Sequence, residues 1–193
     1  PGANGSLFAL RRPLYRPISE TRGDDFELPI RVIVDGHRSI LEPDAISEEE
    51  TSVRYADEFR RKVRIINWMV VSAVILLGEA IARGRWLLAF QLLSHKINRW
   101  LVPVWLLGLV PVTVALLGHG AIYTAALAGQ SLLYAIALTG LLLARAGVAL
   151  PAPLSLPVYF VVVNAASLAG LVSRALGREV RWHKRADSES DPR

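Results

Sequence analysis

One long stretch of this sequence is almost free of charge: between Leu101 and Ser173 the only Asp, Glu, Lys or Arg is Arg145. Neither an ordinary soluble domain nor a disordered basic tail has this composition. Residues 1–64 hold 11 Lys and Arg against 12 Asp and Glu, a net charge of −1, whereas residues 65–193 hold 11 against 5, a net charge of +6. The sequence therefore predicts a polar segment followed by a membrane segment.

The apolar stretch divides into three predicted membrane spans within residues 101–176, at about 101–118, 121–144 and 156–173. Each comes close to, or exceeds, the ~20 residues that a helix needs to cross a bilayer. Gln130 and Asn164 are polar residues within these spans. We expect both to form hydrogen bonds with neighbouring helices, because a polar group in lipid needs a partner.

Residues 65–100 are predicted to form interfacial amphipathic helices rather than spans. The apolar run at 65–82 is interrupted by Asn67, Ser72 and Glu79. Its uninterrupted part is shorter than a span requires. We therefore expect this run to lie at the membrane surface.

The second part of the interfacial region has helical periodicity. Gln91, His95 and Asn98 are spaced so that they share one face, opposite a set of apolar residues. Tryptophan and arginine side chains favour the headgroup level of a bilayer. The expected anchors of this kind are Trp86, Trp100, Arg85 and Arg99.

Residues 177–193 form a basic and polar tail that we expect to be disordered. Its side of the membrane stays open. Three spans place it opposite the interfacial segment, whereas the preference of basic residues for the cytoplasm places both on the same side. A fourth span at residues 65–82 would restore the side of the tail, but it would move either residues 83–99 or the polar segment to the other side. We therefore expect three spans and leave the side of the tail open.

Residues 1–64 would make only a marginal globular domain by themselves, so we expect them to complete a larger one. A short buried strand is predicted at 7–10 and a polar helix at 47–64. Residues 24–34 leave two structures open. A capping pattern, with Asp24 as the cap and Glu27 three residues on, favours a helix. Pro29 and the β-branched residues after it favour a strand.

The adjacent carboxylates Asp24 and Asp25 are the strongest candidates for chemistry in the polar segment. A carboxylate at a loop-to-helix junction can accept a proton from an attacking hydroxyl group that lies within hydrogen-bond reach. The alternative is that the pair only caps a helix. These two residues alone do not decide between a general base and a cap.

A cationic cluster precedes the membrane segment and consists of Arg60, Arg61, Lys62 and Arg64. It could hold a diphosphate through bidentate guanidinium contacts. It could equally meet anionic lipid headgroups, which the residues alone favour. The chain has no cysteine, and its four histidines lack metal-ligand spacing, so we expect no zinc site.

Several short motifs follow one another in a distinctive order. They are Gly2-Ala3-Asn4-Gly5, Asp24-Asp25-Phe26-Glu27-Leu28, Glu58-Phe59-Arg60-Arg61-Lys62-Val63-Arg64-Ile65, Ser94-His95-Lys96 and Arg99-Trp100-Leu101-Val102-Pro103. This ordered series resembles membrane-bound family-2 glycosyltransferases, the inverting enzymes related to cellulose and hyaluronan synthases. The resemblance covers nearly the whole chain, but only the second half of such an enzyme.

The resemblance implies an α/β fold class for the polar segment, as the second half of a glycosyltransferase-A-type domain. Interfacial helices and an all-α bundle of about three spans would follow it. The resemblance also favours the helix at residues 24–34. Asp25 matches the family's catalytic base, and Asp24 matches the first member of the acidic pair. The residues that match the wall of the acceptor site are Gly2, Asn4 and Gly5.

The family's Gln-x-x-Arg-Trp motif, which helps to hold the donor diphosphate, falls at residues 61–65. Only Arg64 matches it, since Arg61 and Ile65 stand where Gln and Trp are expected. We therefore expect Arg64 and Arg61 to face the diphosphate. The missing Trp argues against processive polymer synthesis.

The family's nucleotide-binding strands and its Asp-x-Asp motif for Mg²⁺ or Mn²⁺ would precede Pro1. We therefore expect a fragment that binds no metal and is inactive alone. The implied partners are a nucleotide-sugar donor, a glycan or lipid acceptor and membrane lipids, with no nucleic acid. The implied location is a bacterial plasma membrane, with the catalytic part in the cytoplasm.

A non-enzymatic alternative stays open. In a membrane-anchored subunit, Asp25 would only cap a helix and the basic cluster would bind lipid. A transporter is disfavoured, because the predicted spans contain no Asp or Glu and only one Arg.

Overall fold

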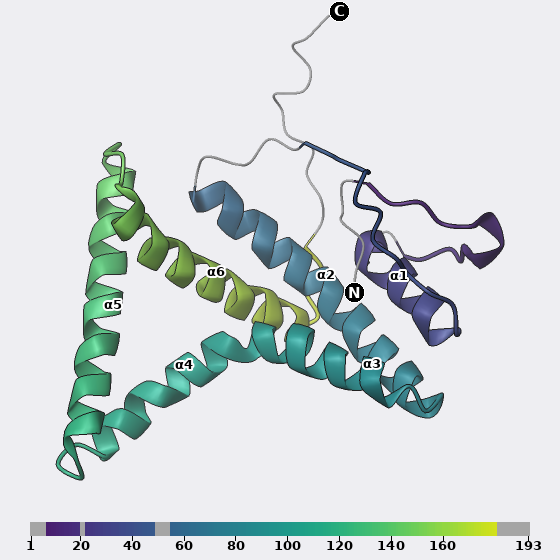
Figure 1. Ribbon diagram of the computed structural model, residues 1–193. Helices are drawn as coiled ribbons and strands as arrows, with labels where there is room; N and C mark the ends of the chain where they lie inside the picture. The colour runs from purple at the N-terminus through teal and green to yellow at the C-terminus, as the bar shows by residue number, and fades with distance from the viewer. Residues whose placement is uncertain (1–6, 20–21, 49–54, 181–193) are drawn as a thin grey trace, which may run out of the picture.

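A computed structural model describes residues 7–19, 22–48 and 55–180, and the regular elements in these ranges are all helical (Figure 1). In chain order they are η1 Arg12–Leu14, α1 Asp24–Val34, α2 Tyr55–Ala82, α3 Trp86–Gln91, η2 Leu92–Ile97, α4 Asn98–Ala115, α5 Ala121–Arg145 and α6 Ala152–Ala175. The predicted α/β fold is therefore wrong, since the described ranges contain no strand. Leu7 and Phe8, which belong to the predicted buried strand, are exposed. Leu7 forms only a single bridge, and residues 8–10 adopt no regular structure.

The helix at residues 24–34 is confirmed as α1. Three acidic residues lie in its first turn, where they suit the helix dipole. Phe26, Ile30 and Val34 recur every four residues and bury one face. This burial outweighs the strand propensity of the β-branched residues. The helix ends at Val34, and Gly36, with a φ of 96°, completes the terminal turn in a conformation that few other residues would adopt.

α2 is one continuous helix that joins the last part of the predicted polar helix to the predicted interfacial run. Residues 47–48 of that predicted helix are irregular, and 49–54 lie outside the described ranges. The polar residues that interrupt its apolar run form hydrogen bonds or ion pairs with other parts of the protein. The Asn67 amide donates to the Arg178 carbonyl oxygen at 2.9 Å, and Ser72 donates to Glu27. Glu79 lies 3.8 Å from Arg31.

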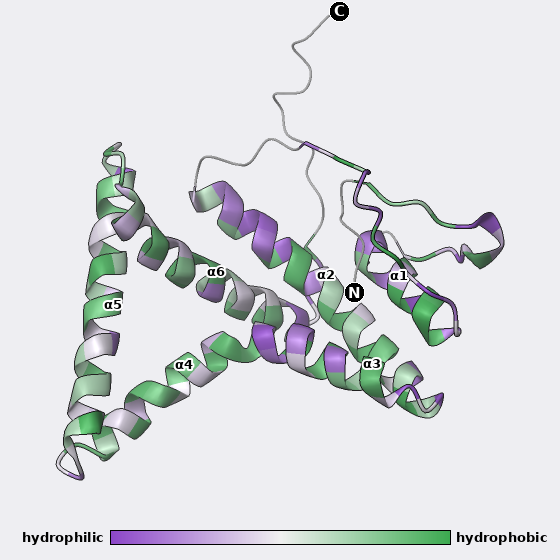
Figure 2. Cartoon of the chain, viewed as in Figure 1, coloured by the Kyte–Doolittle hydropathy of each residue, from purple (hydrophilic) through white to green (hydrophobic). Residues whose placement is uncertain are grey.

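Four helices in the described ranges are long and apolar enough to cross a membrane: Tyr55–Ala82, Trp86–Ala115, Ala121–Arg145 and Ala152–Ala175. The prediction of about three spans is therefore wrong. It discounted α2 because of its polar residues, although these are satisfied by protein partners. Figure 2 shows apolar residues along α4, α5 and α6, and polar residues gathered at the start of α2. The chain is consistent with a multi-pass membrane protein.

The hydrophobic core lies where α1 packs against α2, α3, η2 and the start of α4 (Figure 1). Trp100 is 6% exposed and forms an edge-to-face contact with Phe26, with ring centroids 6.3 Å apart. Its predicted role as an interfacial anchor is therefore wrong, whereas Trp86 is exposed. The core residues from different elements are Phe26, Ile30, Val34, Ile66, Leu76, Leu88, Leu92 and Trp100.

The C-terminal helices make two kinds of close contact. Gln130 on α5 donates to the Thr113 hydroxyl on α4 at 3.4 Å, which confirms the expected interhelical bond. Asn164 instead donates to the Phe160 carbonyl oxygen of its own helix, so the expected interhelical bond is wrong there. α6 packs along α2, and a Cβ atom at Gly170 would lie only 2.9 Å from the Val63 carbonyl oxygen.

The segment after α6 begins on the surface of α2. The Trp68 indole donates to the Val180 carbonyl oxygen at 2.8 Å, beside the bond between Asn67 and Arg178. The first residues of the predicted disordered tail are therefore held in place. Residues 181–193 lie outside the described ranges.

The C-terminal end of α1 is tied to the turn between α2 and α3. Asp35, the residue after α1, accepts a hydrogen bond from Arg83 at 2.6 Å. Its other carboxylate oxygen lies 3.0 Å from Arg16. α1 therefore has a fixed attachment at its end as well as along its buried face.

Candidate active site at the start of α1

Asp25 lies in the first turn of α1, where the helix approaches α2. A Cβ atom placed on Gly23 would lie 3.1 Å from the Asp25 Oδ1 atom and 3.5 Å from Met69 of α2. The carboxylate therefore folds back over the start of its own helix, beside α2. Gly23, not Asp24, occupies the N-cap position, so the expectation that Asp24 caps the helix is wrong. Asp24 lies inside the helix, and its Oδ1 atom accepts from the Asp25 backbone N–H at 2.9 Å.

Burial and the neighbouring Asp24 carboxylate raise the pKa of Asp25 above its ordinary value of 3.8. The backbone N–H groups of Phe26 and Asp25 and the charge of Lys96 act in the opposite direction, but they are weaker. A carboxylate with a raised pKa holds a proton more strongly when it accepts one. The environment of Asp25 therefore strengthens it as a general base.

Lys96, on η2, is the cation that acts on Asp25 from across the site. Its ammonium group lies 5.3 Å from the centroid of the Phe26 ring, a cation–π distance. The Phe26 ring in turn packs on Trp100. Lys96 was not among the site residues predicted from the sequence. The only signal was its place in the Ser94-His95-Lys96 motif.

Glu27 is completely buried between α1 and α2 and serves as a structural anchor beside the candidate base. Its Oε1 atom accepts from Arg31 at 2.8 Å and 3.1 Å and from Arg22 at 3.0 Å, and its Oε2 atom accepts from Ser72. Burial alone would raise the pKa of Glu27, but these donors outweigh burial and hold the pKa below its ordinary value of 4.5. The sequence suggested Glu27 only as a capping partner.

The predicted cationic cluster is largely engaged along α2. Arg60 forms a salt bridge with Asp57 at 2.7 Å. Arg61 and Lys62 both form salt bridges with Glu58, at 2.9 Å and 3.7 Å. The Arg64 guanidinium lies 5.6 Å from the centroid of the Trp68 ring.

The predicted site residues therefore fall into two groups. Asp24 and Asp25 lie together at the start of α1, whereas Arg61 and Arg64 lie on the first turns of α2. Gly2, Asn4 and Gly5, the predicted acceptor-site wall, lie outside the described residues.

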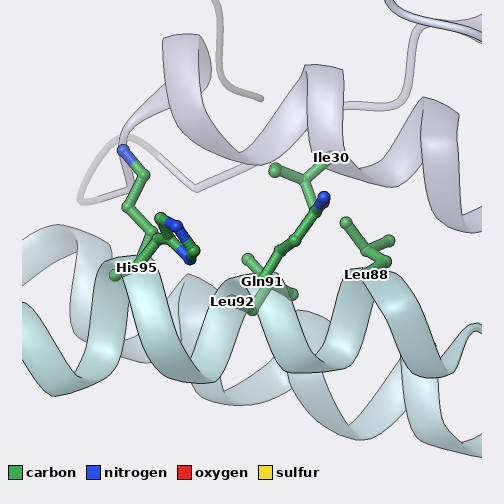
Figure 3. A pocket seen from close by; sticks show the side chains of 6 residues that line it. Ile30, Leu88, Gln91, Leu92 and His95 are labelled. Atoms are coloured by element: carbon green, nitrogen blue, oxygen red, sulfur yellow. The ribbon is translucent and has the colours of Figure 1, made fainter.

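A small cavity opens between α1 and the segment formed by α3 and η2 (Figure 3). Its volume is about 180 Å³. The lining residues are Ile30, Leu88, Gln91, Leu92, His95 and Lys96. The predicted polar face of this helix is thus partly correct, since Gln91 and His95 face the cavity together with Lys96.

No group of three or more His, Asp or Glu side chains that could hold a metal ion occurs within the described ranges.

No protein-family model, curated protein or solved structure matches the chain significantly. The resemblance to family-2 glycosyltransferases therefore rests on the ordered motifs alone.

Proposed function

We propose that the chain is part of an inverting membrane glycosyltransferase that moves a sugar from a nucleotide-sugar donor to a glycan or lipid acceptor of the cell envelope. The observation that carries this proposal is the environment of Asp25. The residue that matches the family's base lies in the first turn of a helix, and burial and Asp24 raise its pKa. A residue that only capped the helix would instead occupy the N-cap position, which belongs to Gly23.

The reaction would be a single displacement. The Asp25 carboxylate accepts the proton of an acceptor hydroxyl group while the hydroxyl oxygen attacks the anomeric carbon of the donor. The new carbon–oxygen bond forms as the bond to the diphosphate breaks, which inverts the anomeric centre. The proton remains on Asp25, and the nucleoside diphosphate carries away the bonding electrons.

The leaving diphosphate needs positive charge nearby. Arg64 is the residue of this chain that would supply it, with Arg61 beside it on α2. A divalent ion held by another part of the protein would supply further neutralisation when bound. The membrane-length helices would attach the site to a bacterial membrane.

The non-enzymatic alternative requires basic side chains that are available to lipid headgroups. Arg60, Arg61 and Lys62 are paired with acidic residues of the same helix, which reduces the net charge that this surface presents. The same pairing also limits Arg61 as a ligand of the diphosphate, so these contacts do not separate the two functions. The environment of Asp25 is the observation that favours the enzyme.

The test uses the full-length protein in membrane vesicles, supplied with Mg²⁺ or Mn²⁺ and a panel of radiolabelled nucleotide sugars. Asp25→Asn should lower sugar transfer by roughly 10²–10⁴-fold and leave nucleotide-sugar binding intact. Asp44→Asn, in an exposed turn, is the matched control and should keep wild-type activity. Wild-type turnover by Asp25→Asn, or no transfer from any donor by the wild type, would contradict the proposal.

A further inference from the structure

The cavity between α1 and the α3–η2 segment combines an apolar floor with a polar wall. Its apolar part, called the floor here, consists of Leu88 and Leu92 of the α3–η2 segment and Ile30 of α1 opposite them, which are 6%, 2% and 1% exposed. The polar wall comes from one face of the α3–η2 segment and consists of Gln91, His95 and Lys96. In Figure 3, the side chains of Gln91 and His95 rise from this segment toward α1.

The π-helical turn explains why three polar side chains share this wall. η2, residues Leu92–Ile97, is π-helical, so its bonded turn spans five residues rather than four. Residue 96 therefore follows residue 91 along one side of the helix. In a regular α-helix, the neighbours along a face lie three and four residues apart, and Lys96 would turn away from Gln91.

The hydrogen bonds of Ser94 fix the tautomer of His95. The Ser94 hydroxyl donates its one proton to the Phe90 carbonyl oxygen at 2.7 Å. It can therefore only accept at its 2.7 Å contact with His95 Nδ1, so the neutral imidazole carries its proton on Nδ1. The Nε2 lone pair is then free to accept a hydrogen bond from a hydroxyl group.

We infer that this cavity is the acceptor subsite and binds one hydroxyl-bearing sugar ring, with Gln91 and His95 as its hydrogen-bonding residues. The inference rests on the proposed function and names the chemistry of its acceptor. A carbohydrate ring suits the cavity because it offers hydroxyl donors to Nε2 and the Gln91 amide, and apolar C–H groups to the floor. The volume of about 180 Å³ is below the ~300–1,000 Å³ of pockets for larger ligands and fits a single ring.

Lys96 connects this cavity to the candidate base. Its side chain lines the cavity, and its ammonium group lies over Phe26, the residue next to Asp25. Lys96 therefore links a ring held by Gln91 and His95 to the candidate base, although Asp25 itself does not line the cavity. An anionic headgroup fits less well, because Lys96 is the one cationic side chain of the wall and its charge is shared with Asp25.

The experiment measures binding separately from transfer, with the full-length protein in nanodiscs. The probes are methyl β-glucopyranoside and the corresponding galactoside and mannoside, with inorganic phosphate as the anionic comparison. Calorimetry gives the Kd of each probe for the wild type, Gln91→Leu and His95→Ala. Phe90→Leu, on the exposed opposite face of α3, is the matched control, and thermal unfolding checks that each variant is folded.

At least one glycoside should bind the wild type and the control equally, and each wall variant should weaken it by roughly five- to ten-fold, the effect of one lost hydrogen bond. His95→Gln, which keeps an acceptor, should recover part of the affinity. Glycoside binding that is unchanged in both wall variants, or phosphate binding without glycoside binding, would overturn the inference. If the wall variants lose the glycoside while Asp25→Asn retains transfer, the subsite stands and the proposed role of Asp25 fails.

Discussion

Ser72 on α2 donates a hydrogen bond to the buried carboxylate of Glu27 on α1. The two residues are 45 positions apart in the sequence and join the helix that carries Asp25 to a helix of membrane length. Arg22 and Arg31 complete the shell around the same carboxylate.

Removing the Glu27 carboxylate should destabilise the α1–α2 pair. Glu27→Ala leaves two arginines and a serine without their shared acceptor, and breaking a buried pair in this way costs about 3–5 kcal/mol. Thermal unfolding of the purified protein measures the loss. Asp57→Ala, which removes an exposed pair with Arg60, is the control and should cost only ~0.2–1 kcal/mol. Equal losses in the two variants would contradict the anchoring role of Glu27.

The same carboxylate should make stability depend on acid pH. Because the folded protein lowers the pKa of Glu27 below 4.5, its contribution is fully present above pH 4.5. The contribution is lost as the pH falls below that value through the folded-state pKa. Unfolding curves between pH 3 and 7 should show this loss in the wild type. Glu27→Gln should show a smaller loss, and identical pH dependence in the two proteins would rule out Glu27 as its source.

The pH profile of sugar transfer should report the pKa of Asp25. Transfer by the full-length enzyme should rise with pH as Asp25 ionises, with a midpoint above its ordinary 3.8. Lys96→Ala should move this midpoint upward, since it removes a stabilising positive charge. Asp24→Asn should move it downward, since it removes a repelling carboxylate. The ratio kcat/KM, measured across pH, gives the midpoint, and shifts in the reverse directions would contradict this electrostatic account.

The contact between α2 and α6 should depend on a single glycine. Gly170→Ala places a Cβ atom 2.9 Å from the Val63 carbonyl oxygen and 3.1 Å from the Ile66 Cβ atom, so the helices must separate. We expect a loss of about 1–3 kcal/mol in stability. Gly129→Ala, where no atom lies within 4 Å, is the matched control and should be neutral or slightly stabilising. Thermal unfolding of both variants distinguishes local packing from a general effect of alanine.

The sequence predicted the local structure better than the contacts between distant residues. The four-residue spacing of Phe26, Ile30 and Val34 is consistent with the helix that forms, although Pro29 obscured it. The α/β fold failed because the strand predicted at residues 7–10 has no partner strand in the described ranges. The span count failed because a polar residue such as Ser72 has its partner 45 positions away.

Only part of the candidate site could be predicted from the sequence, because its other residues come from distant positions. Asp25 stands out through its neighbour Asp24, since adjacent carboxylates are visible as a pair. Lys96 lies 71 positions from Asp25 and reaches it through the packing of η2 on α1 and through a π-helical turn. The pattern of apolar and polar residues does not predict that turn.

α1 is attached to its surroundings at both ends, through Glu27 near its start and through Asp35 and Arg83 at its finish. It therefore cannot swing independently of α2, and the two helices tilt as one lever. Membrane helices adjust their tilt to the thickness of the surrounding lipid. A thicker or thinner bilayer that tilted α2 would thus move the Asp25 carboxylate with it. The position of this carboxylate would therefore depend on the lipid composition of the membrane.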